Sequence, residues 1–273
     1  MIKQAIIPLA GLGTRLLPLT TVIPKELLPI NGKPGLEYIL DECLEAGIKE
    51  IILIISNRKK MIKKYYCNDS IFKKLIRKKK RDIRIKKEHD KIKKLRKIIK
   101  FVYQNSPRGT GDAVLKCQKL IKSNFFLMIL PDDLIIKKNC SLAMIRLHKK
   151  TKASIIASKK VKSNDVTRWG IFKIKKFFKK NFFIDDVIEK PSIKTAPSNH
   201  AVIGRYILSK NIFETLKKQK AGKNGEIHIT DSIKTLIKQK NNFIGYVFDG
   251  KYLDCGTMKG YINSNLKVSN LKL

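Results

Sequence analysis

The sequence predicts an α/β protein with a Rossmann-like, mixed and mainly parallel sheet flanked by helices. Strand-sized apolar runs alternate with helical patterns through residue 150, and this alternation is typical of βαβ units. The chain has 273 residues, of which 43% are hydrophobic, so it can bury a large core. Because it shows no internal repeat and no long linker, we expect a single domain over residues 1–273.

The first half supplies the clearest elements. Residues 34–46 place Leu36, Leu40 and Cys43 on one helical face, with Pro34 near the start and Gly47 past the end. The expected strands are residues 4–9, 50–56, 98–104 and 124–130, and the other expected helices are residues 111–121 and a highly charged helical excursion at 59–97.

The second half is richer in strands. The expected strands are residues 153–161, 170–174, 183–189, 201–208 and 242–248, and the expected helices are residues 209–217, 230–238 and 258–265. Most strands of the first half run into loops rich in Gly, Pro or Asp, where binding residues are commonly found.

The net charge of +38 invites comparison with nucleic-acid-binding proteins. The excess is mostly Lys and is spread along the chain, and Ile and Asn, which also have AT-rich codons, are abundant with it. Phe72 is the only aromatic residue between Ser70 and Lys100, so the Lys-rich stretch lacks the interleaved rings that stack on bases. We therefore expect no specific nucleic-acid partner.

The sequence also shows no recognisable targeting segment and no metal-binding spacing of Cys or His. We find no signal peptide and no apolar stretch long enough to span a bilayer, so no membrane association is expected. The five Cys residues form no CxxC pair and the four His residues show no metal spacing. These features predict reduced thiols, no zinc site and a cytoplasmic location.

A Gly-rich loop directly follows the first expected strand. Its residues 9–15 read Leu-Ala-Gly-Leu-Gly-Thr-Arg, and backbone N–H groups at Gly11 and Gly13 could close on phosphate oxygens beside Arg15. A dinucleotide fingerprint would need Gly at position 16, which is Leu16, and no Walker A sequence is present. Taken alone, this loop is equally compatible with a plain tight turn.

Two adjacent carboxylates, Asp132 and Asp133, end the strand at 124–130. Carboxylates at a strand end are good oxygen ligands for Mg²⁺. Successive residues of a strand point in opposite directions, so only one of the two is expected to face a site. We expect Asp133 only to cap the turn.

Taken together, the motifs resemble those of the nucleotidyltransferases that make nucleoside-diphosphate sugars. The segments that match the motifs of this family are 11–15 (Gly-Leu-Gly-Thr-Arg), 24–29 (Pro-Lys-Glu-Leu-Leu-Pro), Gln104 with 109–111, 130–133, 169–170, 189–191, 196–206, 225–227 with 230–231, and 254–256. The chain is most similar to the bacterial UTP–glucose-1-phosphate uridylyltransferases, to which segments 196–206 and 254–256 point. The resemblance covers nearly the whole chain and implies the nucleotide-diphospho-sugar transferase fold.

The resemblance implies Mg-assisted, in-line transfer of a uridylyl group from UTP to glucose 1-phosphate. Gly11, Gly13 and Arg15 would hold the triphosphate, Lys25 would neutralise charge between the substrates, and Lys190 would hold the incoming phosphate. Asp132 and Asp254 would be the ligands of Mg²⁺. Such chemistry needs cations and backbone donors rather than a Ser-His-Asp set.

The remaining residues implied by the resemblance bind the uracil and the sugar. Gln104 would present a donor and an acceptor to the uracil edge, in a loop with Gly109, and Gly170, Glu189, Gly204 and Glu226 would surround the glucose. Cys255, within Asp-Cys-Gly, would be structural rather than nucleophilic. The N-terminal part would bind nucleotide, the C-terminal part sugar phosphate, and the protein would be a homo-oligomer, either a dimer or a tetramer.

Three alternatives stay open at this point. The first is a glucose-1-phosphate thymidylyltransferase, which shares the first motif, and the second is a weakly active regulatory paralogue. The third, a basic nucleic-acid-binding protein, comes from a different functional class. An N-acetylglucosamine enzyme of bifunctional architecture is not expected, because no C-terminal hexapeptide repeat follows.

Three departures from the family pattern keep the regulatory alternative open: Asn105 stands where Gly is usual, Asp112 lies at a variable position in the same loop, and Gly35 replaces a larger apolar residue. We expect the Asn105 side chain to enter the uracil space and to weaken UTP binding by about 1 kcal/mol at most. The alternative is that this side chain points to solvent and has no effect on UTP binding.

Overall fold

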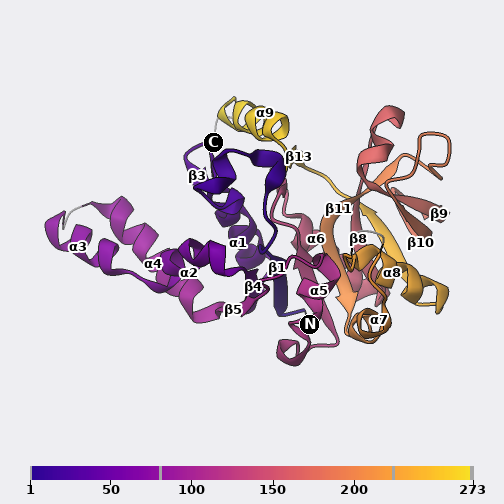
Figure 1. Ribbon diagram of the computed structural model, residues 1–273, viewed down its shortest axis with the longest axis horizontal. Coiled ribbons are helices and arrows are strands. Elements are labelled where there is room, and N and C mark those ends of the chain that lie inside the picture. Colours follow the sequence, from indigo (N-terminus) through magenta and orange to yellow (C-terminus); the bar gives the residue numbers. More distant parts are fainter. Residues whose placement is uncertain (1, 80–81, 223–224, 271–273) are drawn as a thin grey trace.

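The computed structural model describes residues 2–79, 82–222 and 225–270, and it builds them around one nine-stranded sheet (Figure 1). The strand order across the sheet is β5-β4-β1-β6-β11-β8-β12-β10-β9. The strands are β1 (Gln4–Pro8), β4 (Glu50–Ile55), β5 (Ile99–Tyr103), β6 (Phe125–Ile129), β8 (Ser154–Lys160), β9 (Gly170–Phe178), β10 (Asn181–Glu189), β11 (His200–Ser209) and β12 (Phe243–Val247).

The sheet is mixed: seven of its nine strands run in the same direction, and only β10 and β11 run against them. The pairs β5–β4, β4–β1 and β1–β6 are parallel, as is β8–β12, whereas β10 and β11 pair antiparallel with their neighbours. The hairpin of β9 and β10 also curls, because β9 pairs with β10 and with the start of β11. This curl brings the residues at one end of the hairpin beside β11.

The helices are α1 (Gly35–Glu45), α2 (Lys60–Cys67), α3 (Ser70–Lys78), α4 (Ile83–Ile98), α5 (Thr110–Leu115), α6 (Cys140–Thr151), α7 (Ile212–Lys218), α8 (Ile229–Lys238) and α9 (Met258–Ser269). The helix predicted at 111–121 is shorter than expected, since a 3-10 turn at Gln118–Leu120 replaces its second part. Helix α6 was not predicted from the sequence, and neither were the short pairs β7 (Asp133–Ile136) with β13 (Lys251–Asp254) and β2 (Pro29–Ile30) with β3 (Lys33–Pro34).

Two apolar cores lie on opposite faces of the sheet. Alternate residues of β1 enter different cores, with Ala5 and Ile7 in one and Ile6 in the other, as the two-residue period of a strand requires. Helices α1, α2, α4, α6 and α9 contribute to the first core, and α5, α7 and α8 to the second. The sheet is therefore covered on both faces.

A buried ion pair crosses the first core. Arg205 of β11 has no exposed surface, and its guanidinium lies 2.7 Å from the Glu42 carboxylate of α1. Burial lowers the pKa of Arg205, but Glu42 raises it further, so the net shift is upward. The Glu42 carboxylate also accepts hydrogen bonds from Ser141 at the start of α6. One carboxylate thus fixes three elements against one another.

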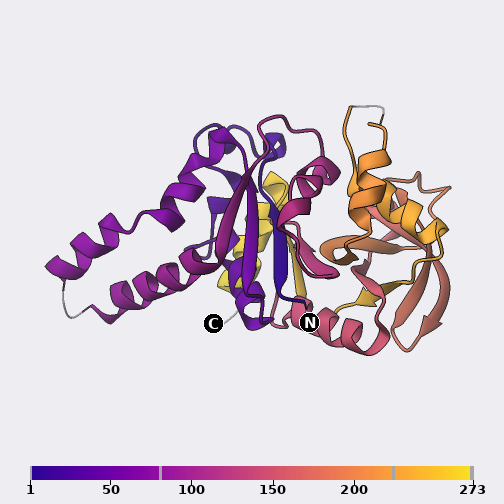
Figure 2. The ribbon, with the colours of Figure 1, turned by 90° about the horizontal axis from the view of Figure 1, so that it is seen from below.

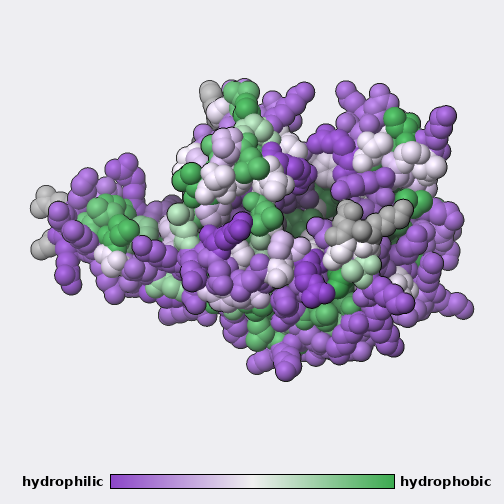
Figure 3. Space-filling view, viewed as in Figure 1, coloured by the Kyte–Doolittle hydropathy of each residue, from purple (hydrophilic) through white to green (hydrophobic). Residues whose placement is uncertain are grey.

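The Lys-rich excursion at 59–97 forms three helices, and α3 and α4 make an arm that projects from the body (Figures 1 and 2). The expectation of helix there is confirmed, although residues 80–81 lie outside the described residues. Hydrophilic side chains dominate the face seen in Figure 3, with an apolar patch on the arm. Of the helices in the described residues, none has the length and apolar composition to cross a membrane.

Candidate active site

A cleft of about 860 Å³ lies where the first half of the sheet meets the curled hairpin and β11. It is lined by every residue that the sequence analysis assigned to the site: Gly11, Gly13, Arg15, Lys25, Gln104, Gly109, Asp132, Gly170, Glu189, Lys190, Gly204, Glu226 and Asp254. Three of these residues follow the carboxyl ends of the parallel strands β1, β5 and β6, which is the usual ligand edge of such a sheet.

The Gly-rich loop leaves β1 in a conformation that requires glycine. Gly13 has a φ of 73°, in the left-handed region, and a Cβ there would lie 3.0 Å from the Thr20 side chain. Thr20 holds the turn by donating from its hydroxyl to the Gly13 carbonyl at 3.0 Å. The loop therefore passes along the cleft wall with its backbone available to a ligand.

Lys25 and Asp132 form the central ion pair of the cleft. The Lys25 ammonium lies 2.7 Å from the Asp132 carboxylate, and the Arg15 guanidinium lies 3.5 Å from the same oxygen. Burial would raise the pKa of Asp132, but Lys25 and Arg15 together hold it below its usual value. Burial would lower the pKa of Lys25, and Asp132 and Glu26 reverse that effect, so both groups are charged at neutral pH.

A second ion pair lies beneath the first. Lys59 is buried, and its ammonium donates to the Glu26 carboxylate at 2.7 Å and to the carbonyl of Leu9. It thereby fixes the start of the Gly-rich loop to the segment that carries Lys25. The sequence placed Lys59 at the start of the charged excursion and gave no sign that it would be buried.

Asp254, on β13, faces the same space as Asp132. A Cβ built on Gly256 would lie 2.9 Å from Asp132 Oδ2 and 3.4 Å from Asp254 Oδ1, so both carboxylates approach the room that this glycine leaves. Asp254 also forms an ion pair with Arg168 at 3.0 Å. Two carboxylates suit a divalent cation that takes its other ligands from water and substrate. In the described residues no cluster of three or more His, Cys, Asp or Glu is placed to hold a metal.

The expectation that Asp133 only caps a turn is wrong. Asp133 is buried, its carboxylate accepts hydrogen bonds from the Tyr252 hydroxyl and from the Gly204 backbone N–H, and it lies in register with Asp254 where β7 pairs with β13. A Cβ on Gly204 would lie 2.5 Å from the same carboxylate, so only glycine fits there. Burial and the neighbouring Asp132 raise the pKa of Asp133 to about 6. The strand β7 that turns Asp133 inward was not predicted.

Gln104 is buried at the end of the cleft, with its amide nitrogen turned into the protein. That nitrogen donates to the Asp112 carboxylate at 2.7 Å and to the Gly109 carbonyl at 3.2 Å. The expectation that Gln104 offers both a donor and an acceptor therefore needs correction, because its donors are already engaged. Asp112, which the sequence marked only as a departure from the family pattern, is the residue that engages them.

The expectation for Asn105 is also wrong. Asn105 is exposed and does not line the cleft, and its side-chain oxygen accepts a hydrogen bond from the Asn57 backbone N–H at 3.0 Å. Asn57 begins the 3-10 turn that follows β4, so its backbone N–H lies outside the strand pairing. The Asn105 side chain turns toward this loop and supplies the acceptor. The side chain therefore neither enters the cleft nor points to solvent without a partner.

Another part of the cleft, to which the resemblance assigned the sugar, is built by the curled hairpin. Gly170 at the start of β9 pairs with Glu189 at the end of β10, and the next residue, Lys190, has a left-handed φ of 45°. Non-glycine residues rarely adopt this conformation, and here it precedes Pro191. The backbone N–H of Lys190 donates to the carbonyl of Trp169 at 3.0 Å, which fixes the turn. Glu226 approaches from the opposite wall, 3.6 Å from His228.

Cys255 lies next to Asp254 but is buried, and burial raises the pKa of its thiol to about 12. A thiol with such a pKa is a poor nucleophile, which confirms its structural role. All five cysteines are free.

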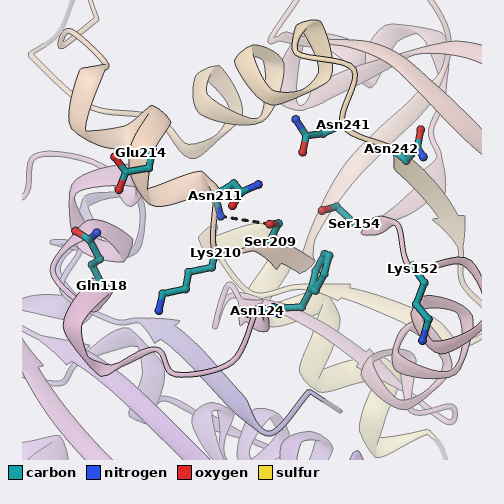
Figure 4. A pocket seen from close by; sticks show the side chains of 11 residues that line it. Gln118, Asn124, Lys152, Ser154, Ser209, Lys210, Asn211, Glu214, Asn241 and Asn242 are labelled. Carbon is teal, nitrogen blue, oxygen red and sulfur yellow. Dashed lines mark hydrogen bonds between the residues drawn. The ribbon is translucent and has the colours of Figure 1, made fainter.

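A second cavity of about 680 Å³ opens at the opposite ends of the central strands (Figure 4). Its lining includes Asn124 before β6, Ser154 at the start of β8 and Ser209 at the end of β11. No residue that the sequence analysis selected lies in it, so it is separate from the first cleft.

Comparisons with known proteins agree on one family. The sequence profile of the family described as "Nucleotidyl transferase" matches residues 4–270. The chain is 36% identical over 270 residues to the UTP–glucose-1-phosphate uridylyltransferase of Mycoplasma pneumoniae, covering 97% of this chain and 91% of that protein. A crystal structure of UDP-glucose pyrophosphorylase with UDP-glucose superposes with a TM-score of 0.88 at 36% identity, over 99% of both chains. A UTP-bound enzyme of the same kind from Acinetobacter baumannii gives 0.87 at 32% identity, over 98% of this chain and 93% of that one.

Proposed function

Because this chain belongs to the nucleotidyl transferase family, we propose that it transfers a uridylyl group from UTP to glucose 1-phosphate, which yields UDP-glucose and pyrophosphate. The observation that carries the proposal is a single cleft with a phosphate loop and the Lys25–Asp132 pair on one wall and the Glu189–Lys190 turn on the other. Two anionic substrates can be held there face to face. The activity is that of a UTP–glucose-1-phosphate uridylyltransferase.

In the reaction, a phosphate oxygen of glucose 1-phosphate attacks the α-phosphorus of UTP in line, and pyrophosphate leaves. The attacking phosphate is already ionised near neutral pH, so no side chain has to remove a proton. The task of the site is to hold two polyanions together and to stabilise the charge that spreads over the transferred phosphoryl group.

On the nucleotide side, the backbone at Gly11 and Gly13 and the guanidinium of Arg15 bind the triphosphate and the departing pyrophosphate. Lys25, held by its ion pair with Asp132, would lie between the substrates and offset their repulsion. Gln104 and Gly109 bind the uracil.

On the sugar side, the Lys190 ammonium binds the phosphate of glucose 1-phosphate, and Glu189 accepts hydrogen bonds from sugar hydroxyls. Gly170, Gly204 and Glu226, which also line the cleft, would border the sugar ring. A rigid turn at Lys190 favours in-line geometry, because the incoming oxygen is then positioned rather than merely attracted.

Asp132 and Asp254 are the residues that would hold a divalent cation, proposed to be Mg²⁺, which would supply positive charge to stabilise the negative charge of the reacting phosphates. The convergence of the two carboxylates at Gly256 supports this assignment. In the absence of substrate their charges are balanced by Lys25, Arg15 and Arg168.

The thymidylyl alternative is not favoured, because the relatives and structures that are about a third identical to the chain over nearly its full length carry uridylyl or UDP-glucose names. A structure named as a glucose-1-phosphate thymidylyltransferase shares the fold at only 20% identity. The regulatory alternative loses one of its supports, since Asn105 does not enter the cleft.

The further expectations remain proposals. One domain binds nucleotide through its N-terminal part and sugar phosphate through its C-terminal part, and it assembles as a dimer or tetramer, which light scattering would decide. The five free cysteines support a cytoplasmic location.

The test is pyrophosphate release from the purified protein with a panel of nucleoside triphosphates and sugar phosphates. We expect release with UTP plus glucose 1-phosphate and Mg²⁺, and its loss on chelation of the metal. Release with dTTP but not with UTP would contradict the uridylyl assignment, and no release with any pair would favour the regulatory alternative.

A further inference from the structure

The amide of Gln104 is held in one orientation by its surroundings. Its nitrogen donates to the Asp112 carboxylate at 2.7 Å and to the Gly109 carbonyl at 3.2 Å. Within the described residues, no group donates to its oxygen. Gln104 is only 4% exposed, and what remains exposed borders the cleft.

Asp112 favours this orientation of the Gln104 amide over the flipped one. A carboxylate has acceptors and no donor, so the Gln104 oxygen could face it only with repulsion between two acceptors. The hydrogen bond is also short and charge-assisted, which makes it stronger than the longer bond to the neutral Gly109 carbonyl. Asp112 is itself buried in the first turn of α5, where a carboxylate is favourable next to the helix N-terminus.

A hydrogen-bond acceptor fixed at this position, the Gln104 oxygen, would distinguish uracil from cytosine. Uracil carries an N3–H donor between two carbonyl oxygens, whereas the same edge of cytosine has an unprotonated N3 acceptor beside an amino group. The Gln104 oxygen can accept from uracil N3–H and meets a lone pair on cytosine N3. A site that leaves buried polar groups unpaired with the wrong ligand rejects that ligand strongly.

We propose that Asp112 is a positioning residue for base specificity: it locks the Gln104 amide with its oxygen toward the nucleotide and so selects uracil over cytosine. This inference rests on the proposed function, in which Gln104 binds the base. It assigns a role to a residue that does not itself border the cleft.

The experiment compares UTP, CTP and dTTP as donors with Asp112→Ala and Asp112→Asn. In Asp112→Ala, we expect the ratio of kcat/KM for UTP to kcat/KM for CTP to fall about tenfold or more, because one buried hydrogen bond orients the amide. Asp112→Asn should give an intermediate ratio, because its side-chain oxygen can still accept from the Gln104 nitrogen, but its amide nitrogen can also donate to a flipped Gln104 oxygen. Only the Gly109 carbonyl then disfavours the flipped orientation. The ratio of UTP to dTTP should stay unchanged in both, because uracil and thymine share the edge in question.

Lys116→Ala is the matched control. Lys116 lies just past α5 with its ammonium 3.9 Å from Asp112, and it does not contact Gln104, so its removal should leave the UTP to CTP ratio at the wild-type value. If Asp112→Ala does not fold, Asp112→Leu replaces it, because the branched Leu side chain has the shape of Asp without its acceptors.

An unchanged UTP to CTP ratio in a folded Asp112→Ala or Asp112→Leu protein would overturn the proposal. A loss in Asp112→Asn larger than that in Asp112→Ala would also overturn it, because Asn keeps an acceptor for the Gln104 nitrogen that Ala lacks. Calorimetric titration with UTP and with CTP measures the same ratio without turnover. A wild-type protein that binds UTP over CTP but transfers nothing would therefore count against the proposed function and not against Asp112.

Discussion

The Lys25 ammonium donates a hydrogen bond to the Asp132 carboxylate over 2.7 Å, although the two residues are 107 positions apart in the chain. Lys25 follows the Gly-rich loop and Asp132 follows β6, so the contact exists only because β1 and β6 are neighbours in the sheet. The pair joins the cation that would lie between the substrates to a carboxylate that would bind the metal.

The first prediction concerns Asp132. Asp132→Ala removes a metal ligand and leaves the charge of Lys25 in a buried position without its partner. We expect turnover to fall to background in a pyrophosphate-release assay. Asp249→Ala is the control, because Asp249 is an exposed carboxylate that pairs with Lys180 outside the cleft, and its loss should leave turnover unchanged. Turnover near the wild-type value in Asp132→Ala would rule out the assigned role.

The second prediction separates the two substrates. Lys190→Ala removes a charge-assisted contact to the sugar phosphate, which should cost about 1.5–3 kcal/mol and raise the KM for glucose 1-phosphate at least tenfold. The KM for UTP should change little, because the triphosphate is held on the opposite wall. Lys194→Ala, an exposed lysine four positions further on, is the control. An unchanged KM for glucose 1-phosphate would reject the role.

The third prediction concerns stability. Glu42→Gln leaves the buried Arg205 guanidinium without its charged partner, which should lower the free energy of unfolding by about 3–5 kcal/mol. Glu214→Gln breaks the exposed pair with Lys217 and should cost less than about 1 kcal/mol. Urea denaturation of both variants measures the difference. Equal, small losses would show that Arg205 finds other partners or is not buried as described.

The fourth prediction concerns Asn105. Because its side chain accepts from the Asn57 backbone and lies outside the cleft, Asn105→Gly should leave the KM for UTP within about twofold of the wild-type value. Steady-state kinetics with varied UTP provides the measurement. A several-fold decrease would show that the side chain obstructs the base, as the sequence suggested.

Much of the architecture was predictable because it follows from local patterns. The helix at 34–46 and the strands at 4–9 and 50–56 have apolar residues at regular spacing and clear punctuation, and each was found within one or two residues of its predicted ends. Helix α6 and strands β7 and β13 lack such signals. The residues of β7 and β13 take strand form because they pair with each other, from Ile136 with Lys251 to Asp133 with Asp254. No local window of the sequence contains both partners.

The sequence by itself determined the fold class, the family and which residues line the cleft, since Gly-rich loops, strand-end carboxylates and the ordered motifs are all local features. Only the tertiary structure decided what several of those residues do. In the folded protein the Asp133 carboxylate accepts hydrogen bonds from Gly204 and Tyr252. The Asn105 side chain accepts one from Asn57, and Asp112 accepts one from Gln104. The physical reason is that a buried side chain bonds to the polar groups that lie next to it in the folded protein. Strand pairing brings those groups together from distant parts of the sequence.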